Sequence, residues 1–303
     1  MKRIIKPALA ILLSVIIIYN GYKLISYYKD ESRSDALNEQ LIAIHICGDE
    51  PEEEPDYEVP DEPAVSEENT ELLPETEPVH ASCPAATAEP TAEPVHQSPK
   101  QAETGTNVVK RTEKHSSGLA SLQKKNADCI AWITIDGTVI DYPVMHTPNA
   151  PGYYLHRNFN GKKASGGTLF LSEICNIDKS DNLIIYGHNM KNGTMFAALT
   201  KYKSKSFWQE HRFITLETSG GIRTYEVICA LATDVSADNS FPYYEFSHTV
   251  NKNEFDTYVA SCKRLAYYDI GLTAEYGDQL LTLSTCEYTH ENGRFLVIAK
   301  RVE

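Results

Sequence analysis

The chain has 303 residues and a formal net charge of −14 at neutral pH, and its length fits one or two domains. Fourteen of its 42 acidic residues lie between Asp49 and Val79, a stretch without lysine or arginine, so the remaining 28 acidic residues balance the 28 basic ones. Because no basic stripe is left, the composition excludes an electrostatic nucleic-acid-binding surface, and we expect no nucleic-acid partner.

The N-terminal residues predict a membrane anchor. A basic tip precedes an apolar run from Ala8 to Tyr19 that only Ser14 interrupts, which is the pattern of an export signal. No small-residue cleavage site follows, and residues 4–28 supply enough length for a spanning helix. We therefore predict a cytoplasmic tip and an uncleaved signal anchor at residues 1–29, making a single-pass cell-membrane protein with its N-terminus inside. A cleaved signal peptide is the alternative, and it also places the remainder outside the cytoplasm.

Residues 30–117 have few large apolar side chains and are rich in Pro, Glu, Thr and Ala. Such a segment buries too little apolar surface to offset the entropy lost on ordering. We expect a disordered, acidic spacer between the anchor and a catalytic domain at residues 118–303.

Within residues 118–303 the composition changes to short, β-branched runs separated by turn residues. Helical spacing of apolar residues appears only at 194–209 and 252–267 after a short helix near residue 119. This pattern predicts a mainly β fold, one closed or nearly closed β-barrel with appended helices. The predicted strands are 132–135, 139–144, 168–171, 183–186, 213–217, 224–233, 280–283 and 295–302.

Seven cysteines lie far apart, without a CxxC pair or a Cys/His cluster, so we expect no metal site and no cofactor. One of them, Cys286, ends an apolar strand, and Arg294 opens the next one after a short polar loop. A thiol at a strand end is held rigidly and reaches the surface. A cation beside it favours the thiolate and stabilises a developing oxyanion.

A second apolar strand ends at Gly187-His188-Asn189, which places an imidazole at another strand terminus. A Cys–His pair supplies a nucleophile and an acid for a leaving amine, the minimum for acyl transfer. From the residues alone, a histidine at a strand end is more often structural than catalytic, and composition does not single out His188.

The motifs resemble those of class B sortases, a family of cysteine transpeptidases, in the right order over residues 119–302. The similar segments are YGHNMKNGTMF (186–196), TLSTC (282–286) with Arg294, WITIDGTVIDYPV (132–144) and GTLFL (167–171). The resemblance implies an eight-stranded sortase barrel with N-terminal helices and a helix, fitting 252–267, in the connection before the last two strands.

The resemblance also implies site residues and partners. Cys286 would attack the Thr carbonyl of a C-terminal sorting signal, His188 would act as acid and base, and Arg294 would stabilise the oxyanion together with the backbone N–H of Glu287. Ser284, Glu287 and Leu155 match substrate-binding positions. The implied partners are surface proteins that carry sorting signals of Asn-Pro-x-Thr or Ser/Pro-Pro-x-Thr-Gly type, and a peptidoglycan precursor amine. We expect a monomer.

Three alternatives remain open at this level. A pilus-type sortase would use a pilin lysine as the resolving amine. A papain-like or NlpC/P60-like hydrolase would place the cysteine at a helix start with the histidine later in the sequence, whereas here the histidine precedes a cysteine that ends a strand. A catalytically inactive surface-binding module would retain the fold without the chemistry.

Overall fold

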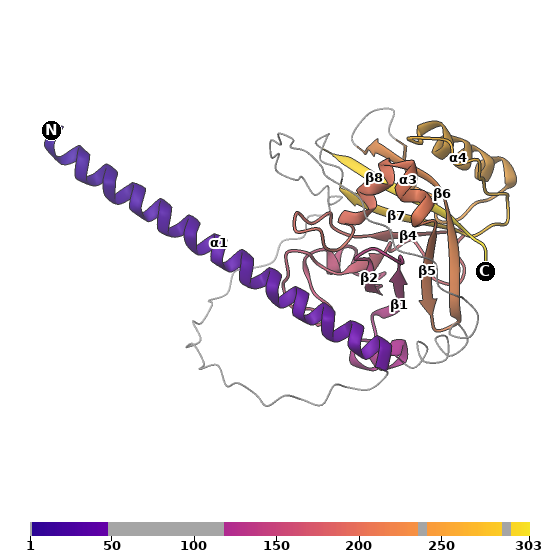
Figure 1. The fold of residues 1–303 in the computed structure, drawn as a ribbon, viewed down its shortest axis with the longest axis horizontal. Coiled ribbons are helices and arrows are strands. Elements are labelled where there is room, and N and C mark those ends of the chain that lie inside the picture. The colour runs from indigo at the N-terminus through magenta and orange to yellow at the C-terminus, as the bar shows by residue number, and fades with distance from the viewer. Residues whose placement is uncertain (1, 48–117, 236–240, 287–291) are drawn as a thin grey trace.

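A closed eight-stranded β-barrel forms the body of the protein, as predicted (Figure 1). The computed structural model describes residues 2–47, 118–235, 241–286 and 292–303. The strands are β1 (Cys129–Thr134), β2 (Asp141–Met145), β3 (Leu169–Leu171), β4 (Asn182–Tyr186), β5 (Phe213–Thr218), β6 (Gly221–Asp234), β7 (Leu280–Cys286) and β8 (Gly293–Arg301). Their inward-facing apolar side chains fill the barrel as one buried cluster.

The strand order around the barrel is β1-β2-β3-β4-β7-β8-β6-β5. Two neighbouring pairs are parallel, β2 with β3 and β4 with β7, and the other pairs are antiparallel. A parallel pair aligns the carboxyl ends of its two strands. The ends of β4 and β7, which carry the predicted His188 and Cys286, therefore lie at the same rim of the barrel.

The predicted helix before the last two strands is confirmed as α4 (Lys252–Leu265). Asn251 caps it by accepting a hydrogen bond from the Glu254 N–H, and Phe255 and Cys262 are buried on its inner face. The predicted helix at 194–209 is instead two short elements, η2 (Ala197–Lys203) and α3 (Lys205–Glu210), because Ser204 between them is extended. Two further single turns are η1 (Tyr153–His156) and η3 (Tyr243–Glu245).

The N-terminal helix α1 (Lys2–Cys47) extends away from the barrel, and its last turns lie against β1 and β2 (Figure 1). Leu41 and Ile44 are buried in a second apolar cluster beside the barrel. The His45 ring stacks on Trp132 with centroids 4.2 Å apart, and its Nε2 lies 3.0 Å from a carboxylate oxygen of the buried Glu217. Residues 30–47, which we assigned to the spacer, are thus helical, whereas residues 48–117 lie outside the described residues.

The predicted membrane anchor at residues 1–29 needs correction. The helix α1 covers this region, yet none of the helices in the described part of the chain combines the length and the apolar character needed to cross a membrane. The apolar run ends at Tyr19 and is followed by Asn20, Gly21 and Lys23, so it falls short of the roughly 20 residues that a span requires. The prediction of a single-pass anchor here is wrong, and the localisation predicted from it loses its basis.

The docked end of α1 offers a first test. Leu41 is 2 % exposed, whereas Ile46, five residues further along the same helix, is 47 % exposed. We expect Leu41→Ala to lower the free energy of unfolding by about 2–4 kcal/mol, because it removes buried methyl groups and leaves a cavity. Urea unfolding followed by tryptophan fluorescence measures the loss. Ile46→Ala is the control, and equal stability of the two variants would contradict a structural role for this helix end.

Candidate active site

The strands β7 and β8 bring Cys286 and Arg294 together. The two residues are direct partners in the antiparallel ladder, so their side chains leave the same face of the sheet. Cys286 is partly exposed, whereas the preceding residues of β7 are buried. The predicted juxtaposition of a thiol and a guanidinium at a strand end is therefore present.

The parallel partner of β7 places His188 beside this pair. Tyr186 of β4 is in register with Ser284, and the Gly187 N–H donates to the Ser284 carbonyl over 3.1 Å. Two residues later the Asn189 side-chain amide donates to the Cys286 carbonyl, also over 3.1 Å. Hydrogen bonds before and after His188 thus fasten it alongside the last residues of β7.

Gly187 is needed for this path because the chain passes close to packed side chains. A Cβ atom at Gly187 would lie 2.7 Å from a ring carbon of the fully buried Phe196. The Thr285 hydroxyl donates to the Gly187 carbonyl over 2.7 Å. The backbone of Gly187 is therefore confined by packed side chains and fixed by the hydrogen bond from Thr285. A residue with a Cβ atom does not fit before the histidine.

The His188 ring is held by atoms from η1. Its Nε2 lies 2.8 Å from the Leu155 carbonyl oxygen, and its ring stacks on that of His156 with centroids 5.3 Å apart. Burial lowers the pKa of His188. The Leu155 carbonyl opposes this shift, while His156 and Arg294 lower the pKa further. The ring is thus biased towards its neutral form and can accept a proton from a thiol.

A buried tyrosine that the sequence did not predict as a site residue contacts the strand that carries Cys286. The Tyr243 hydroxyl lies 2.7 Å from the Ser284 hydroxyl. Burial raises the pKa of Tyr243 to about 12, the Ser284 hydrogen bond and Arg294 lower it, and Cys286 raises it. Tyr243 thus contacts the strand that carries Cys286, two residues before the thiol. Its own sequence context, a turn between β6 and α4, carries no signal for this position.

The other thiols of the barrel are protected. Burial raises the pKa of Cys129 and Cys229 to about 12 and that of Cys175 to about 11, and it also raises the pKa of Cys262 well above its usual value. Among the described cysteines, the exceptions to burial are Cys286 and Cys47 of α1. Within the barrel, Cys286 is therefore the thiol that a substrate can reach.

The predicted substrate-binding residues are placed differently from one another. The Ser284 side chain is buried against Tyr243. Leu155 is partly buried, and its backbone carbonyl rather than its side chain meets His188. Glu287 lies outside the described residues. Substrate contacts of all three remain predictions.

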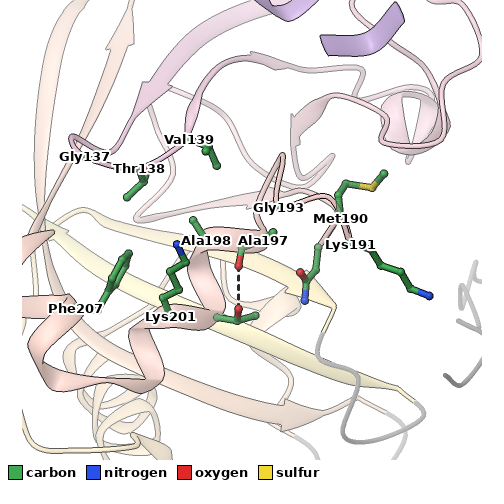
Figure 2. A pocket seen from close by; sticks show the side chains of 12 residues that line it. Gly137, Thr138, Val139, Met190, Lys191, Gly193, Ala197, Ala198, Lys201 and Phe207 are labelled. Atoms are coloured by element: carbon green, nitrogen blue, oxygen red, sulfur yellow. Dashed lines mark hydrogen bonds between the residues drawn. The ribbon is translucent and has the colours of Figure 1, made fainter. Parts of the chain in front are cut away.

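A cavity of about 510 Å³ lies next to the site (Figure 2). It is bounded by the turn between β1 and β2, by residues 189–193 after His188, and by η2. Lys201 and Phe207 form one side and Met190 and Lys191 the other (Figure 2). Asn189, whose side-chain amide donates to the Cys286 carbonyl, also lines this cavity. In the described segments, no group of three or more His, Cys, Asp or Glu side chains is placed to hold a metal ion.

A thiol, an imidazole and a guanidinium at one rim of a closed barrel are the groups that cysteine-dependent acyl transfer requires. The sortase domain family matches residues 133–302. The chain is 36 % identical over 188 residues to sortase B of Listeria monocytogenes, covering 61 % of this chain and 74 % of that protein.

Two solved structures resemble the fold. A mutant form of Clostridium perfringens sortase B superposes with a TM-score of 0.59 at 27 % identity, over 65 % of this chain and 92 % of that one. A Staphylococcus aureus sortase B–substrate complex gives 0.56 at 27 % identity, over 61 % and 85 %. The chain belongs to the sortase family and is a class B sortase-like cysteine transpeptidase.

Proposed function

We propose that this sortase cleaves a C-terminal sorting signal after threonine and joins the surface protein to a peptidoglycan amine. The observation that carries the assignment is the direct pairing of Cys286 with Arg294, next to the end of the parallel strand β4, which His188 follows by two residues. A sortase B of Staphylococcus aureus that resembles this chain has been solved as a substrate complex, which supports a substrate-processing role for this chain. The protein is expected to act as a monomer.

The proposed reaction has two acyl transfers. Neutral His188 takes the Cys286 proton, and the thiolate attacks the threonine carbonyl to form a C–S bond. Arg294 donates hydrogen bonds to the oxyanion, the C–N bond breaks, and the imidazolium gives its proton to the leaving amine. The acceptor amine then attacks the thioester and loses a proton to His188. The C–S bond breaks and the Cys286 thiolate returns.

Mass spectrometry of peptide reactions tests the proposal. Asn-Pro-x-Thr and Ser/Pro-Pro-x-Thr-Gly peptides are each incubated with the protein, alone, with a glycine-type peptide amine, and with a lysine side-chain amine. We expect a new amide between the threonine carboxyl and the added amine. Formation of the amide with the lysine side-chain amine but not with the glycine-type amine would favour the pilus-type alternative. The absence of cleavage and of a thioester in every arm would favour an inactive binding module.

A further inference from the structure

The contact between His188 and η1 determines which ring nitrogen handles protons. Nε2 lies 2.8 Å from the Leu155 carbonyl oxygen. A carbonyl oxygen only accepts hydrogen bonds, so this nitrogen carries a hydrogen whether the ring is neutral or charged. The proton that comes and goes is therefore the one on Nδ1.

The Leu155 carbonyl is itself fixed through its neighbour Tyr154. The Tyr154 hydroxyl donates to an Asp128 carboxylate oxygen over 2.7 Å and accepts from the Asn126 amide over 2.9 Å. The Tyr154 side chain is 1 % exposed, and its carbonyl accepts the Thr168 N–H over 3.0 Å. A side chain buried and bonded in this way leaves the next peptide little freedom to rotate.

Gly167 leaves the space that this carbonyl occupies. A Cβ atom at Gly167 would overlap the Leu155 carbonyl oxygen and lie 2.6 Å from the Tyr154 oxygen. Gly167 also has a φ of +59°. Gly271 has a comparable φ of +79°, but a Cβ atom there meets nothing within 4 Å. Gly167 is therefore subject to a steric requirement that Gly271 lacks.

We propose that the η1 turn, with Gly167 packed against it, positions the catalytic histidine by holding its Nε2–H, so that Nδ1 exchanges protons with the leaving and incoming amines. The proposal rests on the acid/base role proposed above for His188. During acylation the C–S bond forms, the C–N bond breaks, and the Nδ1 proton moves to the amine nitrogen. During resolution the incoming amine returns a proton to Nδ1 as the thiolate leaves. Tyr154 and Gly167 are positioning residues in this scheme.

The test measures ¹⁵N chemical shifts of His188 in the ¹⁵N-histidine-labelled full chain, with the signals assigned by their loss in His188→Ala. We expect the neutral ring of the wild type to carry its hydrogen on Nε2. Gly167→Ala should mix the two neutral forms and slow single-turnover acylation about tenfold, part of what a positioned acid or base contributes. Gly271→Ala, with a similar backbone requirement, should match the wild type in both measurements.

Tyr154→Phe is a second variant that keeps the backbone and the ring. It removes the hydroxyl's bonds to Asp128 and Asn126, and we expect the same shift in ¹⁵N pattern with about threefold slower acylation. Tyr276→Phe, at a tyrosine that is 48 % exposed, is its control. A wild-type ¹⁵N pattern and acylation rate in Tyr154→Phe, or in a folded Gly167→Ala, would overturn the proposal. Full transpeptidation by His188→Ala would instead overturn the acid/base role. The two failures can be told apart, because the ¹⁵N measurement reports the position of the hydrogen on the ring and does not depend on activity.

Discussion

Replacing Cys286 with alanine is expected to abolish both cleavage of a sorting-signal peptide and formation of a thioester. Cys286 is the partly exposed barrel thiol and the direct ladder partner of Arg294. The reaction as proposed cannot begin without a thiolate at this position, because no bond to the threonine carbonyl can form. Peptide turnover and the mass of the intact protein after mixing with substrate measure the two steps.

The matched control for this variant is Cys47→Ala, which removes the exposed thiol on α1. We expect it to retain most of the activity, because α1 contributes apolar packing rather than chemistry to the barrel. Retained turnover in Cys286→Ala, or loss of turnover in Cys47→Ala alone, would require a different nucleophile.

Replacing Arg294 with lysine is expected to slow acylation about 10²–10³-fold with little change in the melting temperature. A lysine keeps the charge, but a single ammonium does not reproduce the fixed, planar donors of a guanidinium. Loss of one donor to an oxyanion typically costs roughly 3–4 kcal/mol of transition-state stabilisation. Single-turnover acylation of Cys286 and a thermal melt of the same sample separate chemistry from folding.

Arg301→Lys is the control for this experiment, because it makes the same change at the exposed far end of β8. We expect it to acylate at the wild-type rate. If Arg294→Lys did the same while folded, Arg294 would be a surface charge of small energetic value, and the mechanism would reduce to a Cys–His dyad.

Much of the barrel could be predicted from local patterns. The strands are short, β-branched runs separated by turns, and the α4 helix shows apolar residues such as Phe255, Val259 and Cys262 at helical spacing. The pairing of Cys286 with Arg294 could be predicted from the short polar loop between their two strands. The order of the strands around the barrel could not, since periodicity carries no information about which strands are neighbours.

Contacts between distant segments could not be predicted. Composition assigns Leu37, Leu41 and Ile44 to a polar spacer. Only the apolar surface next to β1 explains why Leu41 and Ile44 are buried and Leu37 is partly buried. The group of Leu155 that contacts the His188 ring is its backbone carbonyl. Every residue type has this group, so the sequence carries no signal for the contact. Tyr243 reaches Ser284 from a turn 41 residues away.

Closure of the barrel limits how a peptide can be recognised. In the described part of the chain, each of the eight strands has a hydrogen-bonded neighbour on both sides, so none of them is an edge strand to which an extended peptide could add as a ninth strand. Addition of a strand to the sheet, which reads any sequence alike, is thus not available as the source of affinity. Selectivity for a sorting signal then depends on side chains and loop backbones at the rim. Exchanging the rim loops between relatives should therefore transfer preference for a signal while the strands stay unchanged.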